Sequence, residues 1–266
     1  MSRLDKELLD RNLVVSRAKA KVLIDGGNVY VNGKCCKKCS LVVNDVDEIE
    51  IRGGEMRFVS RGGYKLLKAI ETFSINLQNM VCMDVGASTG GFTDCMLQHG
   101  ADKVYAVDVG TNQLVDSLRQ DRRVVSMEQV NFRYMTSKDI SESIDFASVD
   151  VSFISLEKIL PPLFEVLSSK GRAVCLIKPQ FEAGKENIGK NGIVRNQNVH
   201  LRVLYQLLRL INDTGFTVLG LTFSPVKGSH GNIEYLVYIT KEMAEACLVV
   251  PEQTVKAAYQ ELGDTN

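Results

Sequence analysis

The sequence has no surplus of charge of either sign and no long apolar run. Its 32 Lys and Arg residues balance its 32 Asp and Glu residues, so any attraction for an anion must be local. No apolar run approaches the roughly 18 residues that a helix needs to cross a bilayer, and the first residues lack the apolar core of a signal peptide. The composition, 45% hydrophobic and 24% charged, is typical of a globular protein. Disordered chains, collagens and disulfide-stabilised miniproteins are therefore excluded.

The cysteines and histidines form no recognisable pattern of a disulfide framework, a zinc site or a catalytic triad. The seven cysteines are odd in number and scattered, which favours reduced thiols and a cytoplasmic location. Cys36 and Cys39 form one C-x-x-C pair, but no second pair follows at zinc-site spacing, so we expect no metal. His200 and His230 have no triad partner at a recognisable spacing, which leaves Ser-His-Asp hydrolysis unsupported.

Charge is distributed unevenly along the chain. Residues 1–40 hold nine basic and four acidic residues, whereas residues 41–60 hold five acidic and two basic residues. The sequence therefore predicts a basic patch on a small N-terminal unit.

The pattern of this N-terminal stretch indicates a compact structure. Leucines at helical spacing predict a first helix, and Ser16 is a plausible N-cap for a second one. The apolar residues 29–31 run into Asn32-Gly33, a strong signal for a hairpin. We predict a small α+β domain over residues 1–56, ending in a linker at residues 52–55.

From Val59 onward, apolar runs of strand length alternate with helical stretches. That alternation predicts an α/β domain over residues 57–266, with a mainly parallel sheet and helices on both faces. Helices are predicted at residues 92–99 and 199–212. The predicted strands are residues 81–85, 104–107, 146–149, 173–177, 216–221 and 235–239.

A glycine-rich turn follows the first of these strands. The segment MDVGASTGGFTD, residues 83–94, places glycines where backbone can approach a ligand and where a helix begins. Twenty-two residues after Gly86, the next strand ends in Asp108, a spacing suited to a carboxylate that binds a ribose diol. Ser88 replaces the second glycine of the dinucleotide pattern, so a ligand with a ribose and an amino-acid carboxylate fits better than NAD. A packing turn is an equal alternative for the glycines alone, and Asp108 favours a nucleoside-containing cofactor.

Five segments together resemble the TlyA family, which is FtsJ-like and historically called haemolysins. The segments are residues 60–66 (SRGGYKL), 84–94 (DVGASTGGFTD), 150–155 (DVSFIS), 177–184 (IKPQFEAG) and 231–234 (GNIE). The resemblance implies a Rossmann-like methyltransferase sheet, S-adenosyl-L-methionine as cofactor, and 2′-O-methylation of ribose, with cytidine as the target, in ribosomal RNA. The N-terminal unit likewise resembles the alpha-L RNA-binding module.

The resemblance also implies a Lys-Asp-Lys-Glu catalytic tetrad. Methylating a ribose hydroxyl requires in-line placement of the reactants and a base that takes the hydroxyl proton. A lysine can be that base only when it is neutral, which burial or a second cation would favour. We expect the base to be Lys178, oriented by Asp150, with Lys65 and Glu234 positioning the ribose and tuning charge. The alternative is four ordinary exposed or ion-paired residues.

The cofactor contacts are predicted around the glycine-rich turn. We expect the ribose at Asp108 and the adenine edge at Asn131, for which a solvated loop residue is an equal alternative. The methionine part is expected at Gly86, Ser88, Thr89 and Gly90.

Two basic regions are candidates for contact with RNA. The loop of residues 181–195 follows Lys178 and could close over a substrate, although a plain surface loop is the alternative. The basic residues of the N-terminal unit could contact phosphates, although a solvated helix face is the usual meaning of such a run. These residues are Arg3, Arg17, Lys19, Lys21, Lys34, Lys37 and Lys38.

The leading interpretation is a cytoplasmic, S-adenosylmethionine-dependent ribose methyltransferase. Its partner is expected to be ribosomal RNA within a ribosomal subunit, with no membrane and no obligate protein partner. Three alternatives stay open: a membrane-lysing haemolysin, an RNA-binding or ribosome assembly factor without chemistry, and an NAD-dependent oxidoreductase. The first lacks an evident lytic helix, and Ser88 weakens the last.

Overall fold

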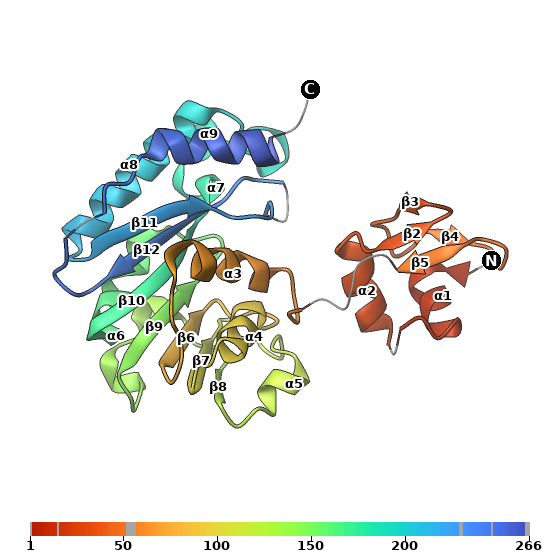
Figure 1. Ribbon diagram of the computed structural model, residues 1–266, viewed down its shortest axis with the longest axis horizontal. Helices are drawn as coiled ribbons and strands as arrows, with labels where there is room; N and C mark the ends of the chain where they lie inside the picture. Colours follow the sequence, from red (N-terminus) through yellow and green to blue (C-terminus); the bar gives the residue numbers. More distant parts are fainter. Residues whose placement is uncertain (1, 15, 52–56, 229–230, 246, 264–266) are drawn as a thin grey trace. The chain divides into compact units, whose positions relative to one another are not determined.

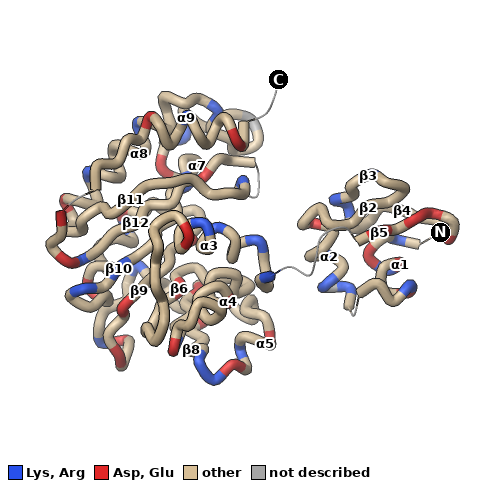
Figure 2. The backbone as a smooth tube through the Cα atoms, viewed as in Figure 1, with Lys and Arg blue, Asp and Glu red and all other residues tan. Residues whose placement is uncertain are grey.

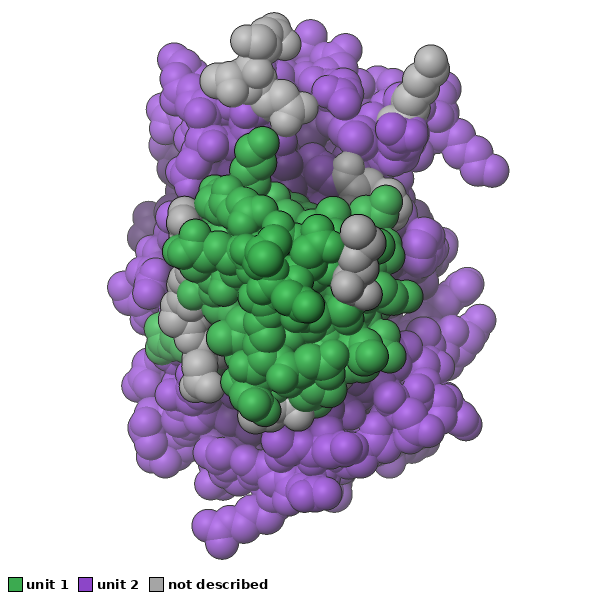
Figure 3. All heavy atoms as spheres, turned by 90° about the vertical axis from the view of Figure 1, so that its right-hand side faces the viewer, with its two compact units in different colours: residues 1–61 green, residues 62–266 purple. Residues whose placement is uncertain are grey.

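The computed structural model describes residues 2–14, 16–51, 57–228, 231–245 and 247–263. The chain divides into two compact units, Met1–Arg61 and Gly62–Asn266, which are coloured separately in Figure 3. The predicted linker at residues 52–55 lies outside the described residues, and the domain boundary after residue 56 stays a prediction. Each unit is described by itself.

The described residues of unit 1 form a small α+β structure with two short sheets (Figure 1). Strand β2 pairs with β3 and β5, and β1 pairs with β4, all antiparallel. Its elements are β1 (Ser2–Arg3), α1 (Leu4–Asp10), α2 (Arg17–Asp25), β2 (Val29–Val31), β3 (Lys34–Cys35), β4 (Val42–Val43) and β5 (Ile49–Ile51).

Local sequence signals account for the elements of unit 1. Ser16 caps α2, because its hydroxyl accepts a hydrogen bond of 3.2 Å from the Lys19 amide. Asn32 and Gly33 join β2 to β3 with φ angles of 49° and 75°, the two positive values that a type I′ hairpin turn requires. The helices and strands bury a common core that includes Leu4, Leu8 and Ile24. The predicted cap and the predicted hairpin are thus confirmed.

Unit 2 is built around a seven-stranded sheet within the described residues (Figure 1). Its strands are β6 (Val81–Val85), β7 (Lys103–Val107), β8 (Val124–Met127), β9 (Ile144–Val149), β10 (Leu167–Ile177), β11 (Thr217–Phe223) and β12 (Tyr235–Thr240). The order across the sheet is β11-β12-β10-β9-β6-β7-β8. From β8 to β10 all neighbours are parallel, whereas β12 runs antiparallel to both β10 and β11.

Helices cover both faces of this sheet, as the alternating pattern predicts (Figure 1). Helix α3 packs against α4, whereas α8 packs against α9 and β11. The helices are α3 (Gly62–Phe73), α4 (Gly91–Gln98), α5 (Asp116–Arg119), α6 (Leu160–Val166), α7 (Pro179–Glu182), α8 (Gln197–Asp213) and α9 (Pro251–Leu262). Short 3-10 turns are η1 (Phe132–Tyr134), η2 (Ser137–Asp139), η3 (Leu156–Lys158), η4 (Lys185–Asn187) and η5 (Lys190–Gly192).

Two strands differ from the prediction by more than two residues. Strand β8 was not predicted, because it is a four-residue edge strand whose side chains are half-buried or exposed and so show no apolar run. Strand β10 begins at Leu167 rather than at residue 173, and its first part has the polar sequence Ser168-Ser169-Lys170-Gly171 with an irregular register. Both misses arise where sheet pairing, not side-chain pattern, determines the strand.

No helix in the described ranges is both long enough and apolar enough to cross a lipid bilayer.

Candidate active site

The candidate site lies at one edge of the sheet of unit 2. Parallel strands end at the same edge, and there Gly86 follows β6, Asp108 follows β7, Asp150 follows β9 and Lys178 follows β10. Glu234 directly precedes β12. Because β12 is antiparallel, its beginning lies at the edge where its neighbours end. Side chains from distant parts of the chain therefore converge here.

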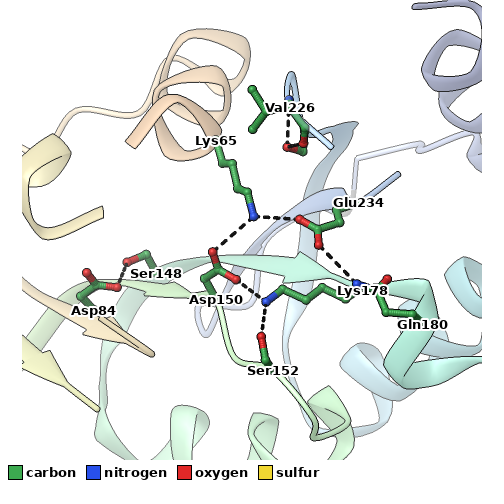
Figure 4. A network of polar contacts seen from close by, with 10 residues as sticks. Lys65, Asp84, Ser148, Asp150, Ser152, Lys178, Gln180, Val226 and Glu234 are labelled. Atoms are coloured by element: carbon green, nitrogen blue, oxygen red, sulfur yellow. Dashed lines mark hydrogen bonds and ion pairs between the residues drawn. The ribbon is translucent and has the colours of Figure 1, made fainter. Parts of the chain in front are cut away.

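The four predicted catalytic residues form one continuous ion-pair network (Figure 4). The Lys65 ammonium donates to Glu234 Oε2 at 2.8 Å and lies 3.4 Å from Asp150 Oδ2. Asp150 Oδ1 lies 2.6 Å from the Lys178 ammonium on its other side. Lys178 also donates to the Ser152 hydroxyl at 2.9 Å. The structure thus brings all four residues together in the order Glu234, Lys65, Asp150 and Lys178.

Burial makes the charges of this network strongly interdependent. Glu234 is 2% exposed and Lys178 is 7% exposed. Burial alone would lower the pKa of Lys65, but the carboxylates of Asp150 and Glu234 outweigh it, so that this pKa is raised. Burial alone would likewise raise the pKa of Asp150, but Lys65 and Lys178 hold it below its usual value. Lys65 and Asp150 are therefore charged at neutral pH.

A glycine at the end of β6 makes room beside this network. Gly86 has a φ of +87°, and a methyl group on it would lie 2.6 Å from the Asp150 carbonyl oxygen. The following turn is fixed by Asp108, which accepts hydrogen bonds from the Ser88 amide at 2.8 Å and the Gly110 amide at 2.7 Å. Sequence spacing placed Asp108 near this turn but gave no sign of these bonds.

A cavity of about 490 Å³ opens between β6, β7 and β9. Four of the predicted cofactor residues line it, namely Gly86, Ser88, Asp108 and Asn131. Its apolar wall includes Val109 and Phe132. The space beside Gly86, which a side chain would fill, and the carboxylate of Asp108 suit a ligand with a ribose and an apolar base. The residues present therefore fit a nucleoside-containing cofactor.

The other two predicted cofactor residues, Thr89 and Gly90, are not among the described residues that line this cavity. Gly90 is the N-cap of α4 and is buried, and a methyl group on it would overlap Leu118. Thr89 is exposed, and its carbonyl accepts a bond from the Val115 amide. The second half of the turn thus packs α4 against the α5 segment.

A second cavity of about 490 Å³ adjoins the first. It is lined by all four residues of the ion-pair network and by residues that follow β9 and β10, including Ser152, Phe153, Gln180 and Phe181. The two cavities share lining residues: Gly86, Ser88, Asp150, Ser152 and Phe153. Ligands in the two cavities would therefore lie next to each other beside these shared residues.

The segment predicted as a substrate loop borders the second cavity. Ile188, Asn191 and Gly192 from this loop are among its lining residues. The buried Asn232 amide anchors the loop, because it donates to the Gly192 carbonyl at 2.9 Å and accepts from the Val194 amide at 2.9 Å. The loop is thus tied to the segment that carries Glu234.

His200, a buried residue of α8, contacts the same loop. Its Nε2 lies 2.9 Å from the Val194 carbonyl and its Nδ1 lies 2.8 Å from the Tyr235 hydroxyl. A carbonyl only accepts, so Nε2 carries the proton and Nδ1 of the neutral ring accepts from Tyr235. Burial lowers the pKa of His200, which keeps the ring neutral.

We expect His200 to make the stability of unit 2 fall on acidification. Below about pH 6.5, His200 of the unfolded chain binds a proton that the folded chain excludes. The free energy of unfolding therefore decreases as the pH is lowered, with a limiting slope of about 1.4 kcal/mol per pH unit. Urea unfolding at several values between pH 7.5 and 5 should show a steeper decline for the wild type than for His200→Gln. Burial raises the pKa of Asp84 to about 7, but Asp84 titrates in both proteins. Equal slopes would contradict the prediction.

The predicted RNA-binding residues of unit 1 are of two kinds. Arg3 and Arg17 both pair with the carboxylate of Asp5, at N–O distances of 3.0 Å and 2.6 Å. The hydrogen bond from Arg17, and to a smaller extent that from Arg3, lowers the pKa of Asp5. Their charges are therefore partly neutralised, which sequence spacing did not indicate. The remaining predicted residues lie half-buried or exposed along α2 and around β3 (Figure 2), and they are Lys19, Lys21, Lys34, Lys37 and Lys38.

Sequence reasoning missed several residues of the site. Ser152 and Gln180 each lie two positions after a predicted catalytic residue, and both contact the network. Asn232 lies two positions before Glu234. All three fall within the segments that carry the family resemblance, so their positions were available although their contacts were not. Within the described residues, no cluster of three His, Cys, Asp or Glu side chains could hold a metal ion.

Comparisons with known proteins extend over both units. A family model described as FtsJ-like methyltransferase matches residues 58–241, and one described as S4 domain matches residues 2–49. The 16S/23S rRNA (cytidine-2′-O)-methyltransferase TlyA of Mycobacterium tuberculosis is 39% identical over 246 residues, which cover 92% of each protein. A solved structure from Streptococcus thermophilus, described as a hemolysin, is 48% identical with a TM-score of 0.79, over 98% of this chain and 96% of that one.

A more distant structure shows the fold alone. An S-adenosylmethionine-dependent methyltransferase from Listeria monocytogenes is 16% identical with a TM-score of 0.50, over 68% of this chain and 99% of that one. The predicted fold class, a Rossmann-like methyltransferase sheet with a small N-terminal α+β unit, is thereby confirmed.

Proposed function

Because the chain belongs to the FtsJ-like methyltransferase family, we propose that it transfers a methyl group from S-adenosylmethionine to a ribose 2′-hydroxyl of ribosomal RNA. The family membership and the TlyA relatives make the chain an RNA methyltransferase. The ribose oxygen, the cytidine and the ribosomal substrate are part of the proposal, and they correspond to the names of those relatives.

The observation that carries the proposal is the pair of adjoining cavities. One has the carboxylate and apolar wall that suit a nucleoside, and the other contains the ion-pair network. They meet at Gly86 and Asp150. Transfer between two ligands requires that their reacting atoms lie within about 3–3.5 Å in the correct orientation, and adjoining cavities with shared walls provide for that.

The first cavity would hold the cofactor through residues at the ends of β6 and β7. Asp108 would accept hydrogen bonds from the ribose, Asn131 would face the adenine edge, and Gly86 and Ser88 would contact the methionine part. When bound, S-adenosylmethionine supplies an electrophilic methyl group on a positively charged sulfur. Thr89 and Gly90 would act indirectly, by shaping the turn.

The second cavity would hold the ribose and remove its proton. We assign Lys178 as the base that accepts the proton of the 2′-hydroxyl, because it follows β10 at the shared wall and lies 2.6 Å from Asp150. Asp150 and Ser152 fix the direction of the Lys178 amine. Lys65 and Glu234 form a charge-balanced pair beside it that positions the ribose.

The two units would divide binding from chemistry. We propose an RNA-binding domain over residues 1–56 and a methyltransferase domain over residues 57–266. The S4 match and the basic residues of unit 1 support the first assignment. Phosphate contacts supply affinity without reading sequence, so the choice of nucleotide would depend on the second cavity and on the shape of the RNA.

The test of this function is transfer of tritiated methyl from S-adenosylmethionine to ribosomal subunits from cells that lack the gene. We expect label in subunit RNA, within dinucleotides that resist nuclease cleavage because the 2′-oxygen is methylated. Label at a base would exclude ribose methylation. Absence of label on either subunit, with cofactor binding intact, would favour an RNA-binding or assembly factor instead.

The lysines at the tip of the β2–β3 hairpin and after it should govern the salt dependence of RNA binding. Replacing both Lys37 and Lys38 by alanine should weaken binding and lower the slope of log K against log salt by about 1.4–1.8, because each phosphate contact contributes about 0.7–0.9. Lys6, which lies on α1 and pairs with Asp10, provides a single-charge control through Lys6→Ala. Filter binding to a subunit RNA fragment between 50 and 200 mM salt, roughly the range where such slopes are resolved, measures the effect. An unchanged slope would remove these lysines from the interface.

A further inference from the structure

A glycine outside the ion-pair network determines where Glu234 can lie. Gly228 lies between β11 and β12, and its amide donates to the Asn232 carbonyl at 2.9 Å. A methyl group on Gly228 would overlap Glu234 Oε1 and lie 2.9 Å from the Glu234 Cδ. The three atoms nearest to that position all belong to the Glu234 carboxyl group. The Glu234 carboxylate thus occupies the space that a side chain on residue 228 would fill.

The backbone conformation of Gly228 does not itself require glycine. Its φ lies outside the left-handed region, unlike that of Gly231 in the same turn, which is +91°. An alanine at Gly228 would therefore fit the chain without backbone strain. Its effect would come from the contact with Glu234 alone.

Glu234 has little freedom to move away from such a contact. Its Oε2 accepts from Lys65 at 2.8 Å, and its Oε1 accepts from the Gln180 amide at 3.4 Å. The side chain is 2% exposed and its backbone carbonyl accepts from the Ser224 amide at 2.9 Å. A shift of the carboxylate would therefore lengthen the bond to Lys65, the residue that links Glu234 to Asp150.

We propose that Gly228 is a positioning residue for methyl transfer, which acts by leaving the space that holds the Glu234 carboxylate against Lys65. The inference rests on the proposed function and adds to it a residue that carries no functional group. Gly228 also lines the second cavity, so the wall of the ribose site is itself shaped by the absence of a side chain. A single methyl group at this position should therefore disrupt the ion-pair network selectively.

The test is a double-mutant cycle between Gly228→Ala and Glu234→Ala, read by methyl transfer to ribosomal subunits. Gly228→Ala alone should lower kcat by about 10-fold or more, and Glu234→Ala alone by about 10²-fold, the loss that a misplacement of reacting groups by about 1 Å can cause. In the double variant, Gly228→Ala should add no further loss, because the atoms that it displaces are already absent. Losses that multiply would overturn the proposal.

Two further measurements separate positioning from a general defect. Gly228→Ala should remain folded at the assay temperature and keep the Kd for S-adenosylmethionine of the wild type, so that the loss falls on kcat. Gly231→Ala, whose methyl meets nothing within 4 Å but whose φ is positive, should instead lower the melting temperature and keep kcat. If Gly228→Ala retains full kcat while the wild type is active, the inference fails. If the wild type itself transfers no methyl, the proposed function fails first.

Discussion

Replacing Lys178 is expected to abolish methyl transfer while cofactor binding persists. Lys178 lines the second cavity and not the first, so its removal leaves the predicted cofactor contacts in place. Loss of a base positioned for proton transfer costs about 10²–10⁴-fold in rate. Lys178→Ala should therefore reduce kcat by at least about 100-fold, measured by tritiated methyl transfer at saturating cofactor.

A second variant distinguishes a base from a fixed positive charge. Lys178→Ala leaves Asp150 with one cationic partner fewer, and such a loss can destabilise a buried carboxylate. Lys178→Arg keeps a cation beside Asp150, but a guanidinium cannot lose its proton in proteins. We expect Lys178→Arg to fold normally and to be inactive as well. If it retains activity, Lys178 contributes charge rather than proton transfer. Lys170→Ala, at an exposed position on the same strand, should match the wild type.

Replacing Gly86 by alanine is expected to remove cofactor binding. The methyl group would lie 2.6 Å from the Asp150 carbonyl oxygen, below any normal contact distance, and the residue would also have to keep a φ of +87°. Either the turn or the start of the β9 loop must then move, and both border the two cavities. Binding of S-adenosylmethionine should weaken by about 100-fold or more, since about 2.7 kcal/mol of strain or lost contact suffices. Isothermal titration calorimetry measures it.

Gly33→Ala provides the matched control for backbone strain. Gly33 has a φ of +75°, close to that of Gly86, but a methyl group there meets nothing within 4 Å. It lies in the β2–β3 hairpin of unit 1, outside both cavities. We expect this variant to lose about 1–2 kcal/mol of stability in unit 1, the cost of a left-handed residue, and to bind the cofactor normally. Equal cofactor affinities for the Gly86→Ala variant and this control would contradict the role of Gly86.

Much of the site could be predicted because four of its residues directly follow strands. Once β6, β7, β9 and β10 are identified as parallel, the residues that follow them must lie at one edge of the sheet. These residues are Gly86, Asp108, Asp150 and Lys178. The strands themselves were evident because they are buried on both faces and read as continuous apolar runs. Edge strand β8 lacks that signal, and the polar start of β10 interrupts it.

What the sequence did not reveal depends on contacts between distant side chains. Nothing near Arg17 indicates that it binds Asp5, since that pairing exists only after α1 and α2 have packed. The anchoring of the 181–195 loop by Asn232 likewise joins residues that no local pattern connects. Gly228 is the extreme case, because its contribution is the volume that it leaves to Glu234.

The reversed direction of β12 also has a consequence during synthesis of the chain. Lys65 is bonded to partners that lie 85 and 169 residues further along the sequence, and the later of the two arrives with β12. A nascent chain or a proteolytic fragment that ends before Glu234 lacks the second carboxylate that balances Lys65 and Lys178. Under the proposed function, we therefore expect methyl transfer only from chains that extend through Glu234 and β12, which is nearly the whole polypeptide.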